Sequence, residues 1–261
     1  MKKINLIMLC IVVAFAFCGC HFDVRGTNEE QSSTTQKKRI TEEQTVTKAD
    51  IDAREAGSIV AEGELEELDS ADLFYYEEIP DHVFARMDGV SFGEDCVVSR
   101  EELRYVRVLH MGFDGKTHIG ELVCHRDLAD DLTAIFLELY AHAYPIEKML
   151  LIDVYHGDDE ASMEDNNTSC FNFRPVPGSD HLSQHAYGRA IDINPLYNPY
   201  ITEEGYSPAN AGEYVDRTQD TPNKIDTDDL CYQLFTEHGF FWGGNWNSVK
   251  DYQHFQKKQG E

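Results

Sequence analysis

The clearest periodic patterns lie in one part of the chain, between Leu103 and Pro145. Leu103 to His110 alternates apolar and polar positions and predicts a strand. Asp114-Gly115 is a hairpin-turn signal before a second predicted strand, Gly120 to Cys124. Asp127 to His142 carries leucine, isoleucine and phenylalanine at helical spacing and predicts a helix that Pro145 ends.

The other segments show weaker patterns, and their order indicates the fold class. Glu62 to Tyr76 predicts a short helix, and the apolar run Met149 to Tyr155 predicts a buried strand. The polar segment from His156 to Gln184 predicts a long loop that forms a wall of a functional site. Thr227 to Gly239 predicts a helix, and Asp251 to Phe255 a last strand. Because strands and helices do not alternate regularly, we expect an α+β fold with a mainly antiparallel sheet.

The N-terminus resembles an export signal. Two lysines precede the apolar run Ile4 to Phe17, which is shorter than a membrane-spanning helix requires. Gly19-Cys20 is typical of a lipoprotein cleavage site, so we expect residues 1–20 to be a signal with lipidation at Cys20. Simple secretion and an uncleaved anchor are the alternatives, and in each case the protein works outside the cytoplasmic membrane. Residues 21–60, poor in aromatic side chains, predict a disordered linker before a single domain at 61–261.

Charge and cysteine content narrow the function classes. The 261-residue chain has 22 Lys and Arg against 48 Asp and Glu, a formal charge of -26. This balance argues against nucleic acid or anionic lipid bound through a basic face. No cysteine pair has CxxC spacing, which argues against a cysteine zinc site. Disulfides and free buried thiols both remain open for the four cysteines beyond the signal, Cys96, Cys124, Cys170 and Cys231.

A histidine and an aspartate around a glycine predict a metal site. His185 and Asp192 lie seven residues apart with Gly188 between them, so a turn can bring both side chains to one point. Imidazole with carboxylate suits zinc better than calcium or magnesium. His254, near the C-terminus, supplies a third ligand. Three protein ligands leave the fourth position open, which is typical of catalytic zinc sites.

These motifs resemble a known family. Ser183-x-His185-x-x-Gly188-x-Ala190-x-Asp192, followed by Asp251-x-x-His254-Phe255, is similar to the VanY-like zinc D-alanyl-D-alanine carboxypeptidases and the related L-alanyl-D-glutamate endopeptidases. The resemblance covers roughly residues 100 to 256. It implies the D-Ala-D-Ala metallopeptidase (hedgehog-like) fold. It also implies a zinc peptidase acting on peptidoglycan stem peptides.

Further residues have predicted roles in this reaction. Hydrolysis needs a base, and Asp251 stands three residues before His254, where it can reach the attacking water. The resemblance implies that Arg174 binds the substrate carbonyl or the developing oxyanion. The candidates for substrate contact are Ser183, Asn172, Tyr187 and Trp242, with Trp246 as a further wall of the pocket. Ser183 has a cap of the turn before His185 as its alternative role, and the other four have ordinary packing.

The cleaved bond and the class of protein have alternatives. Removal of a terminal D-alanine by a D,D-carboxypeptidase is the first expectation. An L,D-carboxypeptidase or an L-alanyl-D-glutamate endopeptidase is the second. A non-catalytic wall-binding module would keep the fold without the reaction, and a structural zinc site would need a fourth protein ligand. We expect a monomer with Zn²⁺ as cofactor and the stem peptide as its partner.

Overall fold

The computed structural model describes residues 45–176 and 178–258. These residues belong to one compact unit. It is built of short helices and three small antiparallel sheets, so the predicted α+β class is confirmed. In the described ranges, no helix combines the length and apolar character that a membrane crossing requires. The predicted signal, 1–20, and most of the predicted linker lie outside the described residues.

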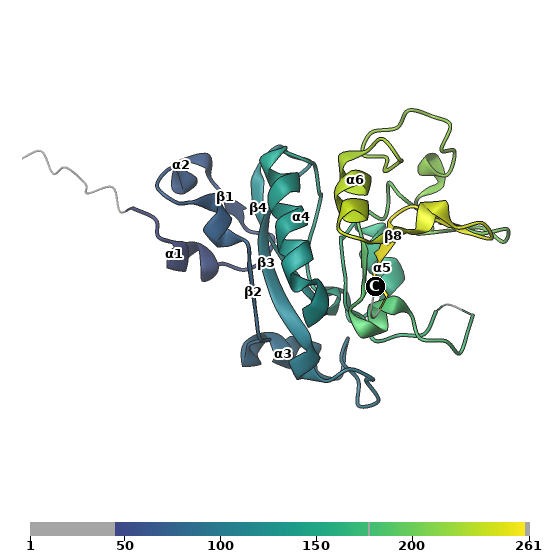
Figure 1. The fold of residues 1–261 in the computed structure, drawn as a ribbon, viewed down its shortest axis with the longest axis horizontal. Coiled ribbons are helices and arrows are strands. Elements are labelled where there is room, and N and C mark those ends of the chain that lie inside the picture. Colours follow the sequence, from purple (N-terminus) through teal and green to yellow (C-terminus); the bar gives the residue numbers. More distant parts are fainter. Residues whose placement is uncertain (1–44, 177, 259–261) are drawn as a thin grey trace, which may run out of the picture. The chain divides into compact units, whose positions relative to one another are not determined.

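The first sheet is centred on a long hairpin. β3 (Leu103–Met111) and β4 (Thr117–His125) pair along their whole length, as the alternating pattern predicts. The short strands β1 (Ile59–Val60) and β2 (Tyr75–Glu77) complete the strand order β1-β4-β3-β2. Helix α4 (Ala129–Ala141) begins two residues after its predicted start and ends one residue before its predicted end. It packs on one face of this sheet (Figure 1).

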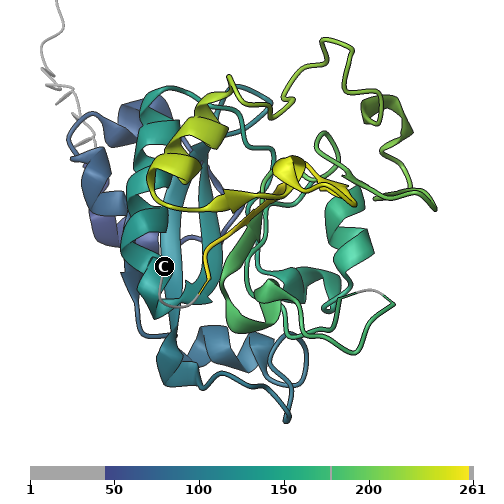
Figure 2. The same ribbon diagram turned by 45° about the vertical axis from the view of Figure 1, so that its right-hand side comes forward.

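The main core joins this first sheet to the C-terminal region. Val106 and Val108 of β3 share one apolar cluster with Phe136 of α4 and Phe255 near the C-terminus. Phe235, from α6 (Leu230–Glu237), stacks on Phe255 with ring centroids 4.5 Å apart. Figure 2 shows α6 (yellow-green) beside α4 (teal). Because this core fixes Phe255, it also fixes the strand that carries His254.

Two three-stranded sheets make up the C-terminal part. One has the order β5-β10-β8 and the other β7-β6-β9. The predicted last strand is therefore divided between two sheets. The strands are β5 (Ala190–Asp192), β6 (Tyr200–Ile201), β7 (Tyr206–Ser207), β8 (Phe241–Trp242), β9 (Lys250–Asp251) and β10 (His254–Gln256).

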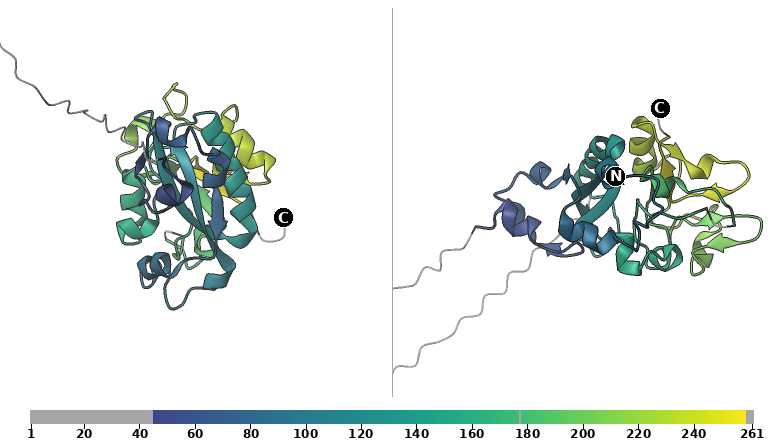
Figure 3. Two further views of the ribbon diagram at one scale, coloured as in Figure 1. Left: turned by 90° about the vertical axis from the view of Figure 1, so that its left-hand side faces the viewer. Right: turned by 90° about the horizontal axis from the view of Figure 1, so that it is seen from below.

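The N-terminal part of the unit corrects the predicted linker. Residues 45–60, expected to be disordered, form α1 (Lys48–Asp52) and β1, and Ile51 is buried against Leu109 and Ile119. Helix α1 lies over the face of the first sheet opposite α4 (Figure 3, left, in purple), whereas β1 is an edge strand of that sheet. A few apolar side chains in a polar segment are enough here, because the sheet supplies the rest of the cluster.

Two further segments differ from the prediction. Glu62 to Tyr76 is not one helix: α2 (Glu62–Leu65), a 3₁₀ helix (Ser70–Leu73) and the start of β2 follow one another. Met149 to Tyr155 is not a strand, because its end forms a 3₁₀ helix, Ile152–Tyr155, stopped by His156 in the left-handed region.

The cysteines beyond the signal are all free thiols. The remaining helices are α3 (Asp81–Met87) and α5 (Asp159–Glu164).

Candidate metal centre and its cavity

A 3₁₀ helix and a glycine turn bring the first two predicted ligands together. His185 lies in the 3₁₀ helix Gln184–Tyr187, which Ser183 caps by accepting the His185 backbone N–H at 3.3 Å. Gly188 ends the helix with φ +64°, and the chain reverses into β5, which ends at Asp192. The turn predicted from the spacing of the motif is therefore the one that the structure contains.

Gly188 is required at this turn for two reasons. Its positive φ is strained for other residues, and an added Cβ would lie 2.6 Å from the His125 backbone N. Gly188→Ala is therefore expected to destabilise the protein by about 2 to 5 kcal/mol, from the left-handed backbone and the overpacking together. Urea unfolding measures this loss.

Gly115 is the matched control for that substitution. It also has positive φ, at +71°, but an added Cβ would meet open space. Gly115→Ala should therefore cost only the backbone part, about 1 to 2 kcal/mol. Equal losses in the two variants would show that the close approach to β4 contributes nothing at Gly188.

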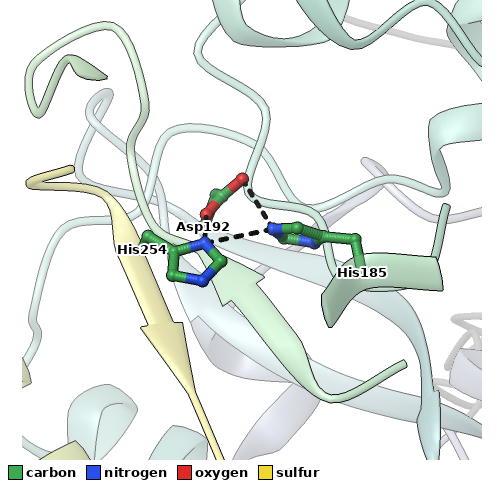
Figure 4. Close-up of side chains that lie close together, drawn as sticks. All are labelled: His185, Asp192 and His254. Atoms are coloured by element: carbon green, nitrogen blue, oxygen red, sulfur yellow. Dashed lines mark hydrogen bonds and ion pairs between the residues drawn. The ribbon is translucent and has the colours of Figure 1, made fainter. Parts of the chain in front are cut away.

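The third predicted ligand comes from β10, which pairs with β5. His254 lies directly opposite Asp192 in this pairing, so the two side chains are on the same face. The Nδ1 atom of His254 is 3.0 Å from Asp192 Oδ1 and 3.2 Å from His185 Nε2. His185 Nε2 is 3.1 Å from Asp192 Oδ2. Figure 4 shows the three groups pointing at one another, and all three residues are buried.

The outer nitrogens of both imidazoles are held by other groups. Nδ1 of His185 is 2.6 Å from the Cys170 carbonyl oxygen, and Nε2 of His254 is 3.1 Å from Gln256 Oε1. If each outer N–H donates to its oxygen, both inner nitrogens present a lone pair to the same point. Such outer partners fix the tautomer and orientation of metal-ligating histidines.

The charges of the cluster favour a cation at that point. Burial alone would raise the pKa of Asp192, but the two imidazoles lower it well below its usual range, so the carboxylate keeps its negative charge. Burial opposes protonation of His254, but the bond and charge of Asp192 outweigh it and raise the pKa of His254 to about 9. The three groups therefore stabilise positive charge where they converge.

The donor set fits zinc in type and in spacing. Two imidazole nitrogens and one carboxylate are common ligands of catalytic zinc sites. Ligand atoms about 2.0 to 2.2 Å from a tetrahedral zinc are separated from one another by about 3.3 to 3.6 Å. The separations of 3.0 to 3.2 Å here are only slightly shorter. A zinc ion therefore requires only a small outward movement of the side chains.

Asp251 reaches the same cavity because the predicted strand is interrupted. In a continuous strand, residues three apart point to opposite faces. Here Asp251 belongs to β9, which pairs with β6, whereas His254 belongs to β10. The break between the two strands lets both side chains line one cavity. Gly243 permits close packing beneath this segment, since an added Cβ would lie 2.7 Å from the Asp251 Cβ.

The environment of Asp251 makes it a candidate acid or base. Burial, helped by the negative charges of Asp192 and Asp159, raises the pKa of Asp251 to about 7, against the charges of His254 and Arg174. Its Oδ1 atom is buried without a hydrogen-bond partner among the described residues. A carboxyl group with a pKa near neutrality can both accept and donate a proton at physiological pH.

The cavity around these groups has a volume of about 530 Å³. Its apolar wall includes Met163, Leu182 and Trp246. Because Met163 belongs to α5 and Leu182 lies just before the motif, the segment 156–184 forms part of the wall, as its length predicts. The polar side chains that line the cavity besides the three candidate ligands include Asp159, Glu160, Arg174, Ser183, Gln184, Tyr200, Ser207, Asp251, Gln253 and Gln256.

Arg174 lines the cavity, and α5 holds it there. Its Nη2 atom is 2.6 Å from Asp159 Oδ2, while its Nε atom is buried without a partner among the described residues. Burial raises the pKa of Asp159, although the charge of Arg174 lowers it. Asp159 fixes one end of the guanidinium and leaves Nε–H without a partner. The sequence analysis missed Asp159, because its contact with Arg174 depends on where α5 lies.

The predicted substrate-contacting residues fall into two groups. Ser183 lines the cavity, but Asn172, Tyr187 and Trp242 do not. Trp242 is buried in the main core, and its indole N–H donates to the Tyr252 carbonyl. Asn172 is buried beside Gly157, and Tyr187 packs against a separate apolar cluster. Trp246 is the tryptophan that lines the cavity, 5.3 Å from the His254 ring.

Comparison with known proteins gives one match. Residues 177–257 match the family model described as D-alanyl-D-alanine carboxypeptidase, which confirms the predicted resemblance over this segment. The segment includes His185, Asp192, Asp251 and His254, whereas Asp159 and Arg174 lie before it. No curated protein and no solved structure matches the chain.

Proposed function

We propose that the protein is a zinc-dependent peptidase that hydrolyses peptidoglycan stem peptides, in the first place as a D-alanyl-D-alanine carboxypeptidase. The observation that carries the proposal is the buried convergence of His185, Asp192 and His254 in a cavity, inside the segment that matches this family. The proposal includes the hedgehog-like fold of those enzymes. It treats the protein as a monomer whose partner is the stem peptide.

Three groups of residues would divide the work of amide hydrolysis. His185, Asp192 and His254 would hold the zinc, which when bound supplies Lewis acidity to polarise a carbonyl and to lower the pKa of water. Asp251 would take a proton from the attacking water and pass it to the leaving amine. Arg174 would donate its free Nε–H to the carbonyl oxygen, on which negative charge develops.

The geometry supports this division because Arg174 Nε and Asp251 Oδ1 have no hydrogen-bond partner among the described residues. Asp159 occupies one side of the Arg174 guanidinium, and no described residue contacts Asp251 Oδ1 through a hydrogen bond. Both groups line the cavity that contains the three candidate ligands. The apolar wall with Met163 and Trp246 suits the methyl groups of alanine residues.

The place of action is a further part of the proposal. The charged and apolar pattern of residues 1–20, with Gly19-Cys20 at its end, supports export and lipid anchoring at Cys20. A membrane-anchored enzyme outside the cytoplasmic membrane would lie close to the cell wall. Mass spectrometry of the protein purified from the membrane fraction tests this part of the proposal. We expect it to show a mature chain that begins at a diacylated Cys20.

Digestion of a purified stem pentapeptide ending in D-alanyl-D-alanine tests the proposed reaction. Zinc-loaded protein is expected to release one alanine, seen by mass spectrometry, and chelation should stop the release until zinc is restored. Cleavage inside the stem would assign the same chemistry to another bond, that of an L,D-carboxypeptidase or an endopeptidase. If no stem peptide is cleaved while zinc is bound at full occupancy, the peptidase proposal is wrong and a wall-binding module replaces it.

A further inference from the structure

Unpartnered buried polar atoms are concentrated in the cavity. Five buried side-chain nitrogen or oxygen atoms of the described residues have no hydrogen-bond partner. Three of them belong to residues that line the cavity, namely Arg174 Nε, Asp251 Oδ1 and Gln253 Oε1. A buried polar atom without a partner costs stability, so folded proteins contain few. Three in one cavity indicate a site completed by a polar ligand.

Gln253 is the member of this group with no role in the reaction described above. It is only 2% exposed, and its backbone is fixed because the Ile193 N–H donates to its carbonyl oxygen at 3.0 Å. Its side-chain Oε1 atom is buried and has no hydrogen-bond partner among the described residues. Gln253 lies between Asp251 and His254 in sequence and lines the same cavity, whereas Tyr252 between them packs against Trp242.

The chemistry of a carboxamide restricts the ligand. A primary amide offers an acceptor oxygen and donor N–H groups side by side. A secondary peptide group offers the complementary N–H and C=O, whereas a carboxylate offers only acceptors and an ammonium only donors. Whichever way the Gln253 amide is oriented, a peptide group can pair with it.

We propose that Gln253 is a substrate-binding residue that hydrogen-bonds the peptide group next to the scissile amide. This proposal rests on the proposed function. It adds a structural feature that the substrate must have. In a carboxypeptidase the residue after the scissile bond is terminal, so the neighbouring peptide group lies on the N-terminal side. The enzyme then requires a substrate with at least two consecutive peptide bonds, and the dipeptide D-alanyl-D-alanine is a poor substrate.

A substitution of similar shape separates this role from a structural one. Gln253→Met keeps the length of the side chain and removes both polar ends. Loss of the substrate contact is expected to lower kcat/KM for the pentapeptide by about 10- to 100-fold. Removal of an unpartnered buried amide should raise Tm by about 2 to 4 °C. A structural role for Gln253 predicts that stability and activity fall together.

The matched control is Gln233, an exposed glutamine of α6 that donates to the Asp228 carbonyl. Gln233→Met should leave kcat/KM and zinc content unchanged. The second control is a pentapeptide N-methylated at the peptide group before the penultimate alanine. N-methylation should lower kcat/KM with the wild-type protein but cause little further loss with Gln253→Met, because the two changes remove the same contact.

Two outcomes would overturn the role of Gln253. One is a kcat/KM for Gln253→Met within twofold of the wild-type value. The other is an equal effect of N-methylation on both proteins. If the wild-type protein cleaves nothing, the proposed function fails, and calorimetry with the stem tetrapeptide then decides on Gln253 separately. Weaker tetrapeptide binding by Gln253→Met supports the contact, and unchanged binding refutes it.

Discussion

Replacing Asp251 with asparagine is expected to lower kcat on the stem pentapeptide by about 10²- to 10⁴-fold, the usual contribution of a general acid–base group. Asparagine keeps the shape of the side chain, but it replaces one carboxylate oxygen with an NH2 group and cannot take a proton from water. Zinc content should not change, because Asp251 is not one of the three converging groups. Stopped-time digestion, with zinc measured on the same samples, gives both quantities.

The expected loss should not come from unfolding. The buried Asp251 carboxyl has an unpartnered oxygen and a raised pKa, and its side chain forms no ion pair or hydrogen bond with a described residue, so replacement by a neutral amide removes none. Tm should therefore stay within a few degrees of the wild-type value. Asp220→Asn, at an exposed aspartate, is the matched control. A kcat for Asp251→Asn within tenfold of the wild-type value would exclude Asp251 as the base.

The parts of the site that the sequence predicted are those set by short-range geometry. His185, Gly188 and Asp192 lie within one turn and one strand, so their spacing alone determines that the two side chains can meet. His254 required a second strand to pair with β5 in one register, and a motif similarity supplied that information. The hairpin and α4 were predictable for the same reason, because their patterns repeat over eight or more residues.

The parts that the sequence missed depend on how distant segments pack. Asp159 contacts Arg174 only because α5 forms within a segment that has no clear helical pattern. Trp242 and Trp246 are four residues apart, and packing against distant residues such as Tyr232 and Phe255 places the first in the core. The division of the last strand has the same origin, since β9 and β10 find different partners.

The apolar run Met149 to Tyr155 shows a different limit of sequence patterns. Five of its residues have apolar aliphatic side chains, and composition alone cannot distinguish a strand from a buried turn. Here the Asp153 carboxylate accepts the Ser91 backbone N–H, and the exposed Val154 is on the outside of the turn. Tertiary hydrogen bonding therefore overrides the local preference for an extended strand.

The largest effect on metal binding is expected from Asp192→Asn. Asp192 is the only negatively charged member of the three converging groups, and it contacts both imidazoles. A neutral amide cannot supply that charge, so zinc affinity should fall by more than about 100-fold, beyond the usual effect of losing an outer partner. Competition with a chromophoric chelator measures the affinity.

The same substitution should also remove the stabilisation that zinc gives to the fold. At a free zinc concentration of 100 times the wild-type Kd, binding adds about 2.7 kcal/mol to the free energy of unfolding. A 100-fold weaker site leaves about 0.4 kcal/mol at the same concentration. Calorimetric unfolding with and without zinc should therefore show a Tm shift for the wild-type protein and almost none for Asp192→Asn.

A second histidine–aspartate pair provides the control for this experiment. His118 Nε2 is 2.9 Å from Asp114 Oδ1 at the hairpin between β3 and β4, but no third group converges there among the described residues. Asp114→Asn should therefore keep one zinc per chain and the full zinc-dependent Tm shift. Wild-type zinc affinity in Asp192→Asn would show that the buried cluster is not the metal site. A lost Tm shift in Asp114→Asn would place the zinc at the hairpin instead.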